Sequence, residues 1–257
     1  MHGILPHVRL LELRFAFDGR AQGVLDIEAL TIGAGERVAV IGASGAGKST
    51  LLKLIDGRLF GWTGRAEVLG RALSPRRPPP RRWQADVGFV FQEFGLVDRA
   101  TVHENVRIGR LGRADPVLSL FGRFTAEDEG AVEQAIRDVG LEELAGERVD
   151  RLSGGQRQRV GVARCLAQEP RILVADEPTS NLDPAGAEAI LGLLRSCAQA
   201  RGATLIVSSH QPKLIARFVE RVIGLREGRV QFDRPASALR AEDLAGLYRW
   251  QVAQPAA

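Results

Sequence analysis

Residues 42–49 decide the fold class, because they read Gly-Ala-Ser-Gly-Ala-Gly-Lys-Ser and fit the pattern GxxxxGK[ST]. A short stretch rich in β-branched apolar residues precedes them at 37–41, and residues 48–55 have helix-forming composition. Strand, glycine-rich loop and helix therefore follow one another. This order predicts a loop whose backbone N–H groups point at phosphate oxygens.

Each residue type in this loop has a reason to be there. Glycine lets the backbone curl around a phosphate, Lys48 can bridge the β- and γ-phosphates, and the Ser49 hydroxyl can ligate Mg²⁺. The residues expected to bind the nucleotide are Gly42, Ser44, Gly45, Gly47, Lys48, Ser49 and Thr50.

A second half of the site is expected at the end of another strand. Residues 172–175 are short and apolar, and Asp176 and Glu177 follow them directly. Asp176 is placed to hold Mg²⁺ through water, and Glu177 to orient or deprotonate the attacking water. Without the phosphate loop, two acids after a strand would indicate a helix cap or a surface pair as strongly as they indicate a catalytic pair.

Composition limits the remaining possibilities. The 257 residues suggest one or two domains, and 45% hydrophobic with 26% charged residues is an ordinary globular balance. The longest apolar runs have four residues, so we expect no membrane-spanning helix. Two cysteines without CxxC spacing, and a start without signal-peptide features, indicate a cytoplasmic protein. The net charge of +4 by itself allows nucleic acid, a membrane surface or phosphate ligands as partners, or merely an arginine-rich genome.

Alternating strands and helices predict a mainly parallel sheet covered on both faces. A helix is expected over about 184–201 and another over about 242–250, and Thr125 is expected to cap a helix. The arginine- and proline-rich residues 71–82 predict an exposed loop, which is either simply solvated or in contact with acidic lipid or a partner. The expected strands are residues 8–13, 24–32, 37–41, 87–91, 172–175 and 204–207.

A third motif narrows the choice. Residues 152–156 read Leu-Ser-Gly-Gly-Gln and precede a helix-like stretch, which makes another helix N-terminus with exposed N–H groups. The glycine-rich loop and this helix start are thus two anion sites. One protein would need both for a single γ-phosphate only if the two sites contact that phosphate from opposite sides. With the motifs above, this order resembles the ATP-binding cassette family along the whole chain. In that family two cassettes pair head to tail around ATP.

The resemblance implies an α/β fold with a P-loop NTPase (RecA-like) core. That core has a parallel sheet, an N-terminal antiparallel β subdomain and an inserted α-helical subdomain at about 93–160. Residues 1–257 would form a single nucleotide-binding domain. ATP and Mg²⁺ are the implied cofactors.

The resemblance also implies residue roles. Ser153, Gly154, Gly155 and Gln156 would contact the ATP held by a second copy of the chain, and Asp183 would lie at the dimer seam.

Other loop residues take roles on the same basis. Gln92 would sense Mg²⁺ and the transmembrane partner, and His210 would contact the γ-phosphate. Phe17 lies where the family stacks an aromatic ring on adenine, with Phe15 a less favoured substitute. Because Glu177 and His210 are both present, an active ATPase is expected.

Several stretches outside these motifs resemble the ATP-binding subunits of phosphonate importers. This implies import of phosphonate or a related phosphorus oxyanion, with membrane permease subunits, a solute-binding protein and a second copy of the chain as partners. The location would be the cytoplasmic face of the membrane. Two departures weaken the substrate class: the Thr179-Ser180-Asn181 version of its loop, and the arginine-proline loop Arg76–Arg82. The similar stretches are residues 87–97, 104–112, 119–124, 209–230 and 239–248.

Residues 119–124 matter most, because in the family they lie in the helical region that faces the permease. Exposed Leu120, Phe121 and Phe124 would form an apolar patch, and such patches mark interfaces. The alternative is a loop that merely connects helices.

Three other functions remain to be weighed. The chain could be a soluble cassette of a multi-enzyme assembly, such as one for carbon–phosphorus bond cleavage, or an importer subunit for a different small solute. A cassette acting on nucleic acid or ribosomes is disfavoured, because there is a single phosphate loop and no basic groove interleaved with aromatics. We therefore expect no nucleic-acid partner.

Overall fold

The chain is described from a computed structural model that covers residues 5–17, 23–91 and 95–248. Contacts divide the chain into two compact units. The first unit consists of residues 1–78 together with 206–257, and the second unit of residues 79–205. Within the described ranges, no helix has both the length and the apolar character to cross a membrane.

The first unit carries the N-terminal strands, the glycine-rich loop and the C-terminal elements. Strand β8 (Thr204–Ser209) has residues in both units. The other elements of the first unit are β1 (Val8–Phe15), β2 (Leu25–Ile32), β3 (Arg37–Ile41), α1 (Lys48–Ile55), β4 (Thr63–Val68), β5 (Arg71–Ala72), α8 (Pro212–Ile215), β9 (Arg221–Arg226), β10 (Arg229–Pro235), a 3-10 turn at Ala236–Ala238 and α9 (Ala241–Tyr248).

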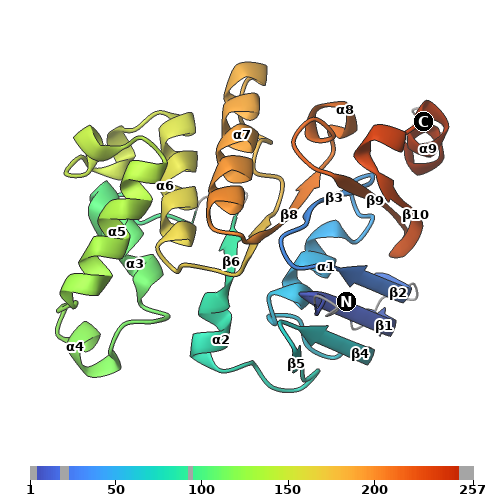
Figure 1. Ribbon diagram of the computed structural model, residues 1–257, viewed down its shortest axis with the longest axis horizontal. Helices are drawn as coiled ribbons and strands as arrows, with labels where there is room; N and C mark the ends of the chain where they lie inside the picture. The colour runs from blue at the N-terminus through green and yellow to red at the C-terminus, as the bar shows by residue number, and fades with distance from the viewer. Residues whose placement is uncertain (1–4, 18–22, 92–94, 249–257) are drawn as a thin grey trace, which may run out of the picture. The chain divides into compact units, whose positions relative to one another are not determined.

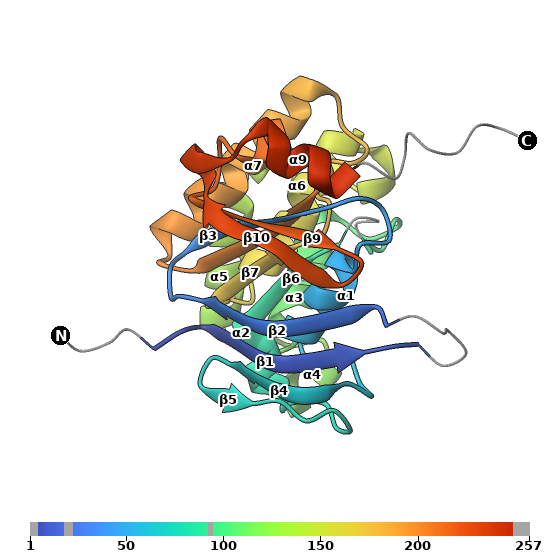
Figure 2. The same ribbon diagram turned by 90° about the vertical axis from the view of Figure 1, so that its right-hand side faces the viewer.

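An antiparallel sheet with the strand order β2-β1-β4-β5 forms one layer of this unit (Figure 2). In β1 and β2, buried apolar residues largely alternate with exposed ones, as expected for a sheet with one face against a core. A bulge interrupts β1 at Glu12, whose φ is 50°, and a Cβ on Gly64 would lie 2.3 Å from the Glu12 carbonyl oxygen. The expected N-terminal antiparallel β subdomain is thus confirmed.

The second sheet of the first unit has the strand order β10-β9-β3-β8. β3 pairs in parallel with β9, and four of its five residues are buried, as expected for a central strand. β10 returns antiparallel to β9 through a tight turn at Glu227 and Gly228, which both have positive φ.

The second unit is mainly helical around a short parallel strand pair. β6 pairs in parallel with β7, and every residue of both strands is buried. Its elements are α2 (Arg81–Asp86), β6 (Val87–Val90), α3 (Val102–Arg110), α4 (Pro116–Leu120), α5 (Ala126–Asp138), 3-10 turns at Glu142–Leu144 and Val149–Arg151, α6 (Gly154–Leu166), β7 (Ile172–Ala175) and α7 (Pro184–Ala200).

Helices α3, α5 and α6 pack against one another (Figure 1). α3 approaches α6 so closely that a Cβ on Gly109 would lie 2.0 Å from the carbonyl oxygen of Arg164, which explains the glycine. A capping box at Thr125 starts α5 as expected, and a similar box at Thr101 starts α3. These helices lie where a helical insertion at about 93–160 was expected, although its limits and the single-domain assignment stay predictions.

Some expectations need correction or lie outside the described residues. The strand expected at 87–91 ends at Val90, and Phe91 directly after it is exposed. The exposed loop expected at 71–82 is shorter, since its ends form β5 and the start of α2. Phe124 is half-buried with the Arg107 guanidinium 5.0 Å from its ring centre, so it does not share the exposure of Leu120 and Phe121.

Candidate functional site

The glycine-rich loop lies between β3 and α1 in the first unit, as predicted. Gly45 and Gly47 have φ values of 79° and 100°, a region that favours glycine. Gly42 has a different reason: a Cβ there would lie 2.2 Å from the carbonyl oxygen of Leu225. The loop therefore depends on glycine both for its curl and for its close approach to β9.

Lys48, the first residue of α1, is almost fully buried, and its Nζ stays within the loop. It donates hydrogen bonds to the carbonyl oxygens of Gly42 at 3.0 Å and Ala43 at 3.2 Å. An ammonium group in such a position is a strong counter-charge for an anion that enters the loop.

Backbone donors of the loop are available to a ligand. The N–H groups of Ser44, Gly45 and Gly47 make no hydrogen bond to any other described residue. Ser49 and Thr50, in the first turn of α1, are half-buried beside them. N–H groups at a helix N-terminus, together with a lysine, form the arrangement that binds phosphate.

The loop is held from outside by two segments that were not singled out from the sequence as supports. The Gly228 N–H donates to the Ala46 carbonyl at 3.0 Å, and the Asp26 N–H donates to the Gly228 carbonyl at 2.9 Å. A Cβ on Gly228 would lie 2.4 Å from the Val24 carbonyl oxygen. Only the Glu227-Gly228 dipeptide, a turn signal, could have indicated this hairpin in advance.

Replacing Gly228 by alanine should damage the loop more than its positive φ alone would. The left-handed conformation costs alanine about 1–2 kcal/mol, and the contact with Val24 adds about 1–3 kcal/mol of overpacking. We expect a lower unfolding temperature and weaker ATP binding, measured by thermal unfolding and by a fluorescent ATP analogue.

Gly35→Ala is the matched control, because Gly35 has φ +74° against +75° for Gly228 but open space around its Cβ position. It should lose stability by the conformational cost alone and keep its ATP affinity. Equal effects of the two substitutions would show that the hairpin does not support the loop.

Two aromatic rings lie at the end of β1. Phe15 is buried, whereas Phe17 is 46% exposed, and their ring centres are 4.9 Å apart in an edge-to-face arrangement. The greater exposure of Phe17 favours it over Phe15 as the adenine-stacking residue.

The predicted acidic pair lies in the second unit at the end of β7. Asp176 is 8% exposed, and its N–H continues the strand pairing by donating to the Val90 carbonyl at 3.1 Å. Glu177 is half-buried and has a φ of 43°, which is rare for a residue other than glycine. Backbone strain of this kind concentrates at functional positions.

The Leu-Ser-Gly-Gly-Gln segment forms the first turn of α6. Ser153 is the N-cap: its Oγ accepts from the Gln156 N–H at 3.3 Å, and the Ser153 N–H donates to Gln156 Oε1 at 2.9 Å. Between them, Gly154 and Gly155 have no positive φ, and nothing lies within 4 Å of a Cβ built on either. Nothing described in one copy of the chain therefore requires glycine at these two positions.

Three further predicted residues have different outcomes. Asp183 is exposed and caps α7, with its Oδ1 accepting from the Gly186 N–H at 2.6 Å, so it has a structural role. His210 is exposed directly after β8. Gln92 lies outside the described residues.

The donors present suit Mg²⁺, which prefers oxygen ligands. Ser49 offers a hydroxyl in the first unit and Asp176 a carboxylate in the second. In the part of the chain that the structure describes, no three His, Cys, Asp or Glu side chains form a metal-binding group.

Comparison with known proteins identifies the family of the chain. The sequence pattern of the ABC transporter family matches residues 25–180, more than half of the chain. The chain belongs to the ABC transporter family, as a member of its ATP-binding and ATP-hydrolysing subunits.

Two relatives carry the same name, phosphonates import ATP-binding protein PhnC. The protein of Burkholderia pseudomallei (strain 1710b) is 42% identical over 250 residues, which are 94% of this chain and 80% of the relative. The protein of Thiobacillus denitrificans is 44% identical over 215 residues, which are 84% of this chain and 82% of the relative.

Solved structures show the same fold. A dimeric ATP-binding cassette in a post-hydrolysis state, bound to ADP and Pi, has a TM-score of 0.77 at 29% identity and covers 90% of this chain and 100% of that one. The cassette cbiO1 from Clostridium perfringens, part of an ABC transporter complex, has a TM-score of 0.79 at 26% identity and covers 96% of this chain and 97% of its own. The predicted fold class is thereby confirmed.

Proposed function

We propose that the chain hydrolyses ATP to power the import of a phosphonate, or a related organophosphorus compound or phosphorus oxyanion, through a membrane permease. The observation that carries the substrate class is the likeness to phosphonates import ATP-binding proteins over 94% of the chain. The chain would act at the cytoplasmic face of the membrane, with a solute-binding protein delivering the substrate to the permease.

The geometry of each unit supports several of the proposed residue roles. In the first unit, Lys48 and the N–H groups at Ser44, Gly45 and Gly47 hold the phosphates, with Gly42 shaping the loop, while Phe17 stacks on adenine. Mg²⁺, when bound, would neutralise phosphate charge. Ser49, Asp176 and Gln92 would hold it, while Thr50 would contact the nucleotide.

Catalysis is assigned to two side chains. Glu177 orients the attacking water and takes its proton, and the strained backbone at this residue supports that assignment. His210, in the first unit, contacts the γ-phosphate.

The second copy of the chain completes the site. Within one copy, neither steric crowding nor a positive φ requires glycine at positions 154 and 155. This supports the close approach of a ligand from outside that copy. That ligand is the ATP of the partner copy, with Ser153 and Gln156 fixing the turn and Asp183 lining the seam.

A groove in the second unit is the proposed seat of a cytoplasmic permease segment. It has a volume of about 540 Å³ and mixes charged and apolar side chains. Its lining residues are Arg99, Ala100, Glu104, Arg107, Ile108, Leu111, Ser119 and Phe124.

The deciding experiment measures the ATPase activity of the complex reconstituted with its permease and binding protein. We expect stimulation by phosphonates, phosphite or phosphate, compared with unrelated solutes. Absence of stimulation by every phosphorus compound would overturn the substrate class. Recovery of the chain with soluble enzymes and without a permease would overturn transport.

Gly154→Ala should separate folding from turnover. Alanine in a helix is more stable than glycine by about 0.5–1 kcal/mol, and there is room for the methyl group. We therefore expect unchanged or higher thermal stability with ATP hydrolysis reduced at least about tenfold, or roughly 1.4 kcal/mol of barrier.

Gly130→Ala is the control, because Gly130 is an exposed residue of α5 with equally open surroundings. It should gain the same stability and hydrolyse ATP at the original rate. Full activity in the Gly154 variant would contradict the proposed contact with a partner's ATP.

A further inference from the structure

Asp98 contacts the chain on both sides of the Leu-Ser-Gly-Gly-Gln turn, residues 152–156. Its backbone carbonyl accepts a hydrogen bond from the Asp150 N–H at 3.0 Å, just before the turn. Its carboxylate accepts from the Arg157 guanidinium at 2.5 Å, directly after the turn. A single residue of the segment that leads into α3 therefore brackets the whole turn.

The segment that carries Asp98 is held by further backbone contacts to the residues before the turn. The Val149 N–H donates to the Ala100 carbonyl at 3.1 Å. In the opposite direction, the Val102 N–H donates to the Glu147 carbonyl at 2.9 Å. Asp98 therefore has a fixed backbone from which its side chain can hold an element on the other side of the turn.

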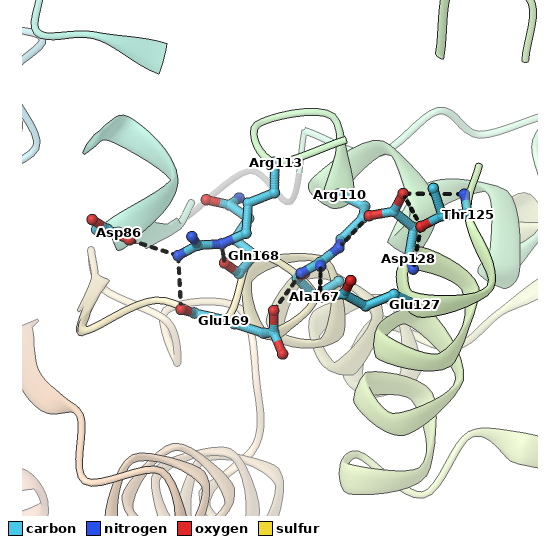
Figure 3. Close-up of polar contacts among 9 residues, drawn as sticks. All are labelled: Asp86, Arg110, Arg113, Thr125, Glu127, Asp128, Ala167, Gln168 and Glu169. Carbon is cyan, nitrogen blue, oxygen red and sulfur yellow. Dashed lines mark hydrogen bonds and ion pairs between the residues drawn. The ribbon is translucent and has the colours of Figure 1, made fainter. Parts of the chain in front are cut away.

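The far end of α6 is held separately by two arginines (Figure 3). Arg110 donates to the Ala167 carbonyl at 3.2 Å and to the Glu169 carboxylate at 2.5 Å. Arg113 donates to the Gln168 carbonyl and, at 3.0 Å, to the Glu169 carbonyl. All of these contacts lie just beyond the last residue of α6, so they fix the end of the helix that is farthest from the turn.

An anchor at one end of a helix does not fix the position of the other end. α6 has 13 residues, so at 1.5 Å per residue it is about 20 Å long. Over such a length, a tilt of about 3° around the far anchor moves the turn by about 1 Å. The hydrogen bonds between Ser153 and Gln156 fix the shape of the turn, whereas its position needs a contact from outside α6.

The ion pair between Asp98 and Arg157 contributes little to the stability of the fold. The side chain of Asp98 is 60% exposed and that of Arg157 is 30% exposed. Pairs with such exposure are worth at most about 1 kcal/mol. Removal of the pair should therefore leave the chain folded, so that its effect on hydrolysis can be measured separately from stability.

We propose that Asp98 is a positioning residue for ATP hydrolysis. Through Arg157 it sets the place of the Leu-Ser-Gly-Gly-Gln turn, so that Gly154 and Gly155 reach the ATP held by a second copy of the chain. The inference rests on the proposed contact between this turn and that ATP. It assigns a role to a residue that was not among the predicted site residues.

The test compares variants of the full chain. Asp98→Ala should lower kcat for ATP hydrolysis at least about tenfold, because a misplacement of 1 Å can cost about 10²-fold. The unfolding temperature and the binding of a fluorescent ATP analogue should stay close to their original values, since the loop around Lys48 is untouched. In the Glu177→Gln background, Asp98→Ala should reduce the amount of ATP-bound dimer in size-exclusion chromatography at limiting ATP.

Exchange of the two charges gives a readout that a merely structural role would not move. Arg157→Ala should impair hydrolysis as Asp98→Ala does, whereas Asp98→Arg/Arg157→Asp should recover most of the lost rate because the opposite charges meet again. Arg151→Ala is the matched control, since it removes an exposed ion pair with Glu147 on the other side of the same turn. It should hydrolyse ATP at the original rate.

Three results would overturn the proposal: full hydrolysis in both Asp98→Ala and Arg157→Ala, equal losses in these variants and in Arg151→Ala, or no recovery on charge exchange. The Gly154→Ala variant separates this failure from failure of the proposed function. If Gly154→Ala is impaired while Asp98→Ala is fully active, only the positioning role is wrong. If both are fully active, the turn does not contact the ATP of a second copy.

Discussion

Glu177→Gln is expected to reduce ATP hydrolysis by about 10²–10⁴-fold, the usual contribution of a general base. Glutamine has nearly the same shape as glutamate but cannot accept the proton of the attacking water. ATP binding depends on the loop around Lys48, so it should persist. The chain should then accumulate as an ATP-bound dimer, detected by single-turnover hydrolysis assays and by size-exclusion chromatography with ATP.

Glu143→Gln is a suitable control, since Glu143 is an exposed glutamate at a 3-10 turn of the same unit. It should hydrolyse ATP at the unmodified rate. If Glu177→Gln also retained full hydrolysis, another residue would be the base, and the reading of the strained backbone at Glu177 would be wrong.

Arg110→Ala should cause the largest loss of stability. The side chains of Arg110 and Asp128 are 4% and 7% exposed, so the substitution leaves a carboxylate buried without its partner. Breaking such a pair costs about 3–5 kcal/mol. Urea unfolding should show this loss, whereas Arg137→Ala, which removes an exposed pair with Glu133 at 3.7 Å, should cost less than about 1 kcal/mol.

The pH dependence of this loss distinguishes a buried ion pair from simple loss of packing. Burial raises the pKa of Asp128, but hydrogen bonds from Arg110 and Thr125 outweigh it and hold the pKa below its usual value. The ionised carboxylate therefore stabilises the native fold above pH about 4, and this contribution is lost as pH falls through the lowered pKa.

In the Arg110 variant, the Asp128 carboxylate stays buried but loses the arginine that lowered its pKa. The pKa of Asp128 should therefore rise. The difference in unfolding free energy between the two proteins should consequently narrow on acidification from neutral pH. A difference that stays constant with pH would mean that lost packing around the arginine causes the whole effect.

Elements with a local cause were predictable from the sequence. The strands at 37–41 and 172–175 are short apolar runs, the loop at 42–49 has a fixed pattern of glycines, and Thr125 is followed by an acid at the spacing of a capping box. The candidate site residues stand directly beside these elements. For that reason their positions on strands, loops and helix starts could be read from neighbouring residues alone.

Features with a distant cause could not be predicted. The support of the loop by Gly228 joins residues far apart in the chain, and Arg110 meets Glu169, which lies 59 residues further along the chain. The neighbouring sequence does not distinguish an arginine that becomes buried from the many arginines that stay exposed. Phe124 was misjudged for the same reason, because the residue that covers it, Arg107, belongs to a preceding helix.

The paired hydrogen bonds between Ser153 and Gln156 bear on how two copies would meet. Because each side chain satisfies the backbone of the other, the first turn of α6 has its shape before any partner arrives. Ordering a flexible segment on association costs about 0.5–1.5 kcal/mol for each immobilised side chain. A surface already in its final form would avoid that entropy loss when two copies associate.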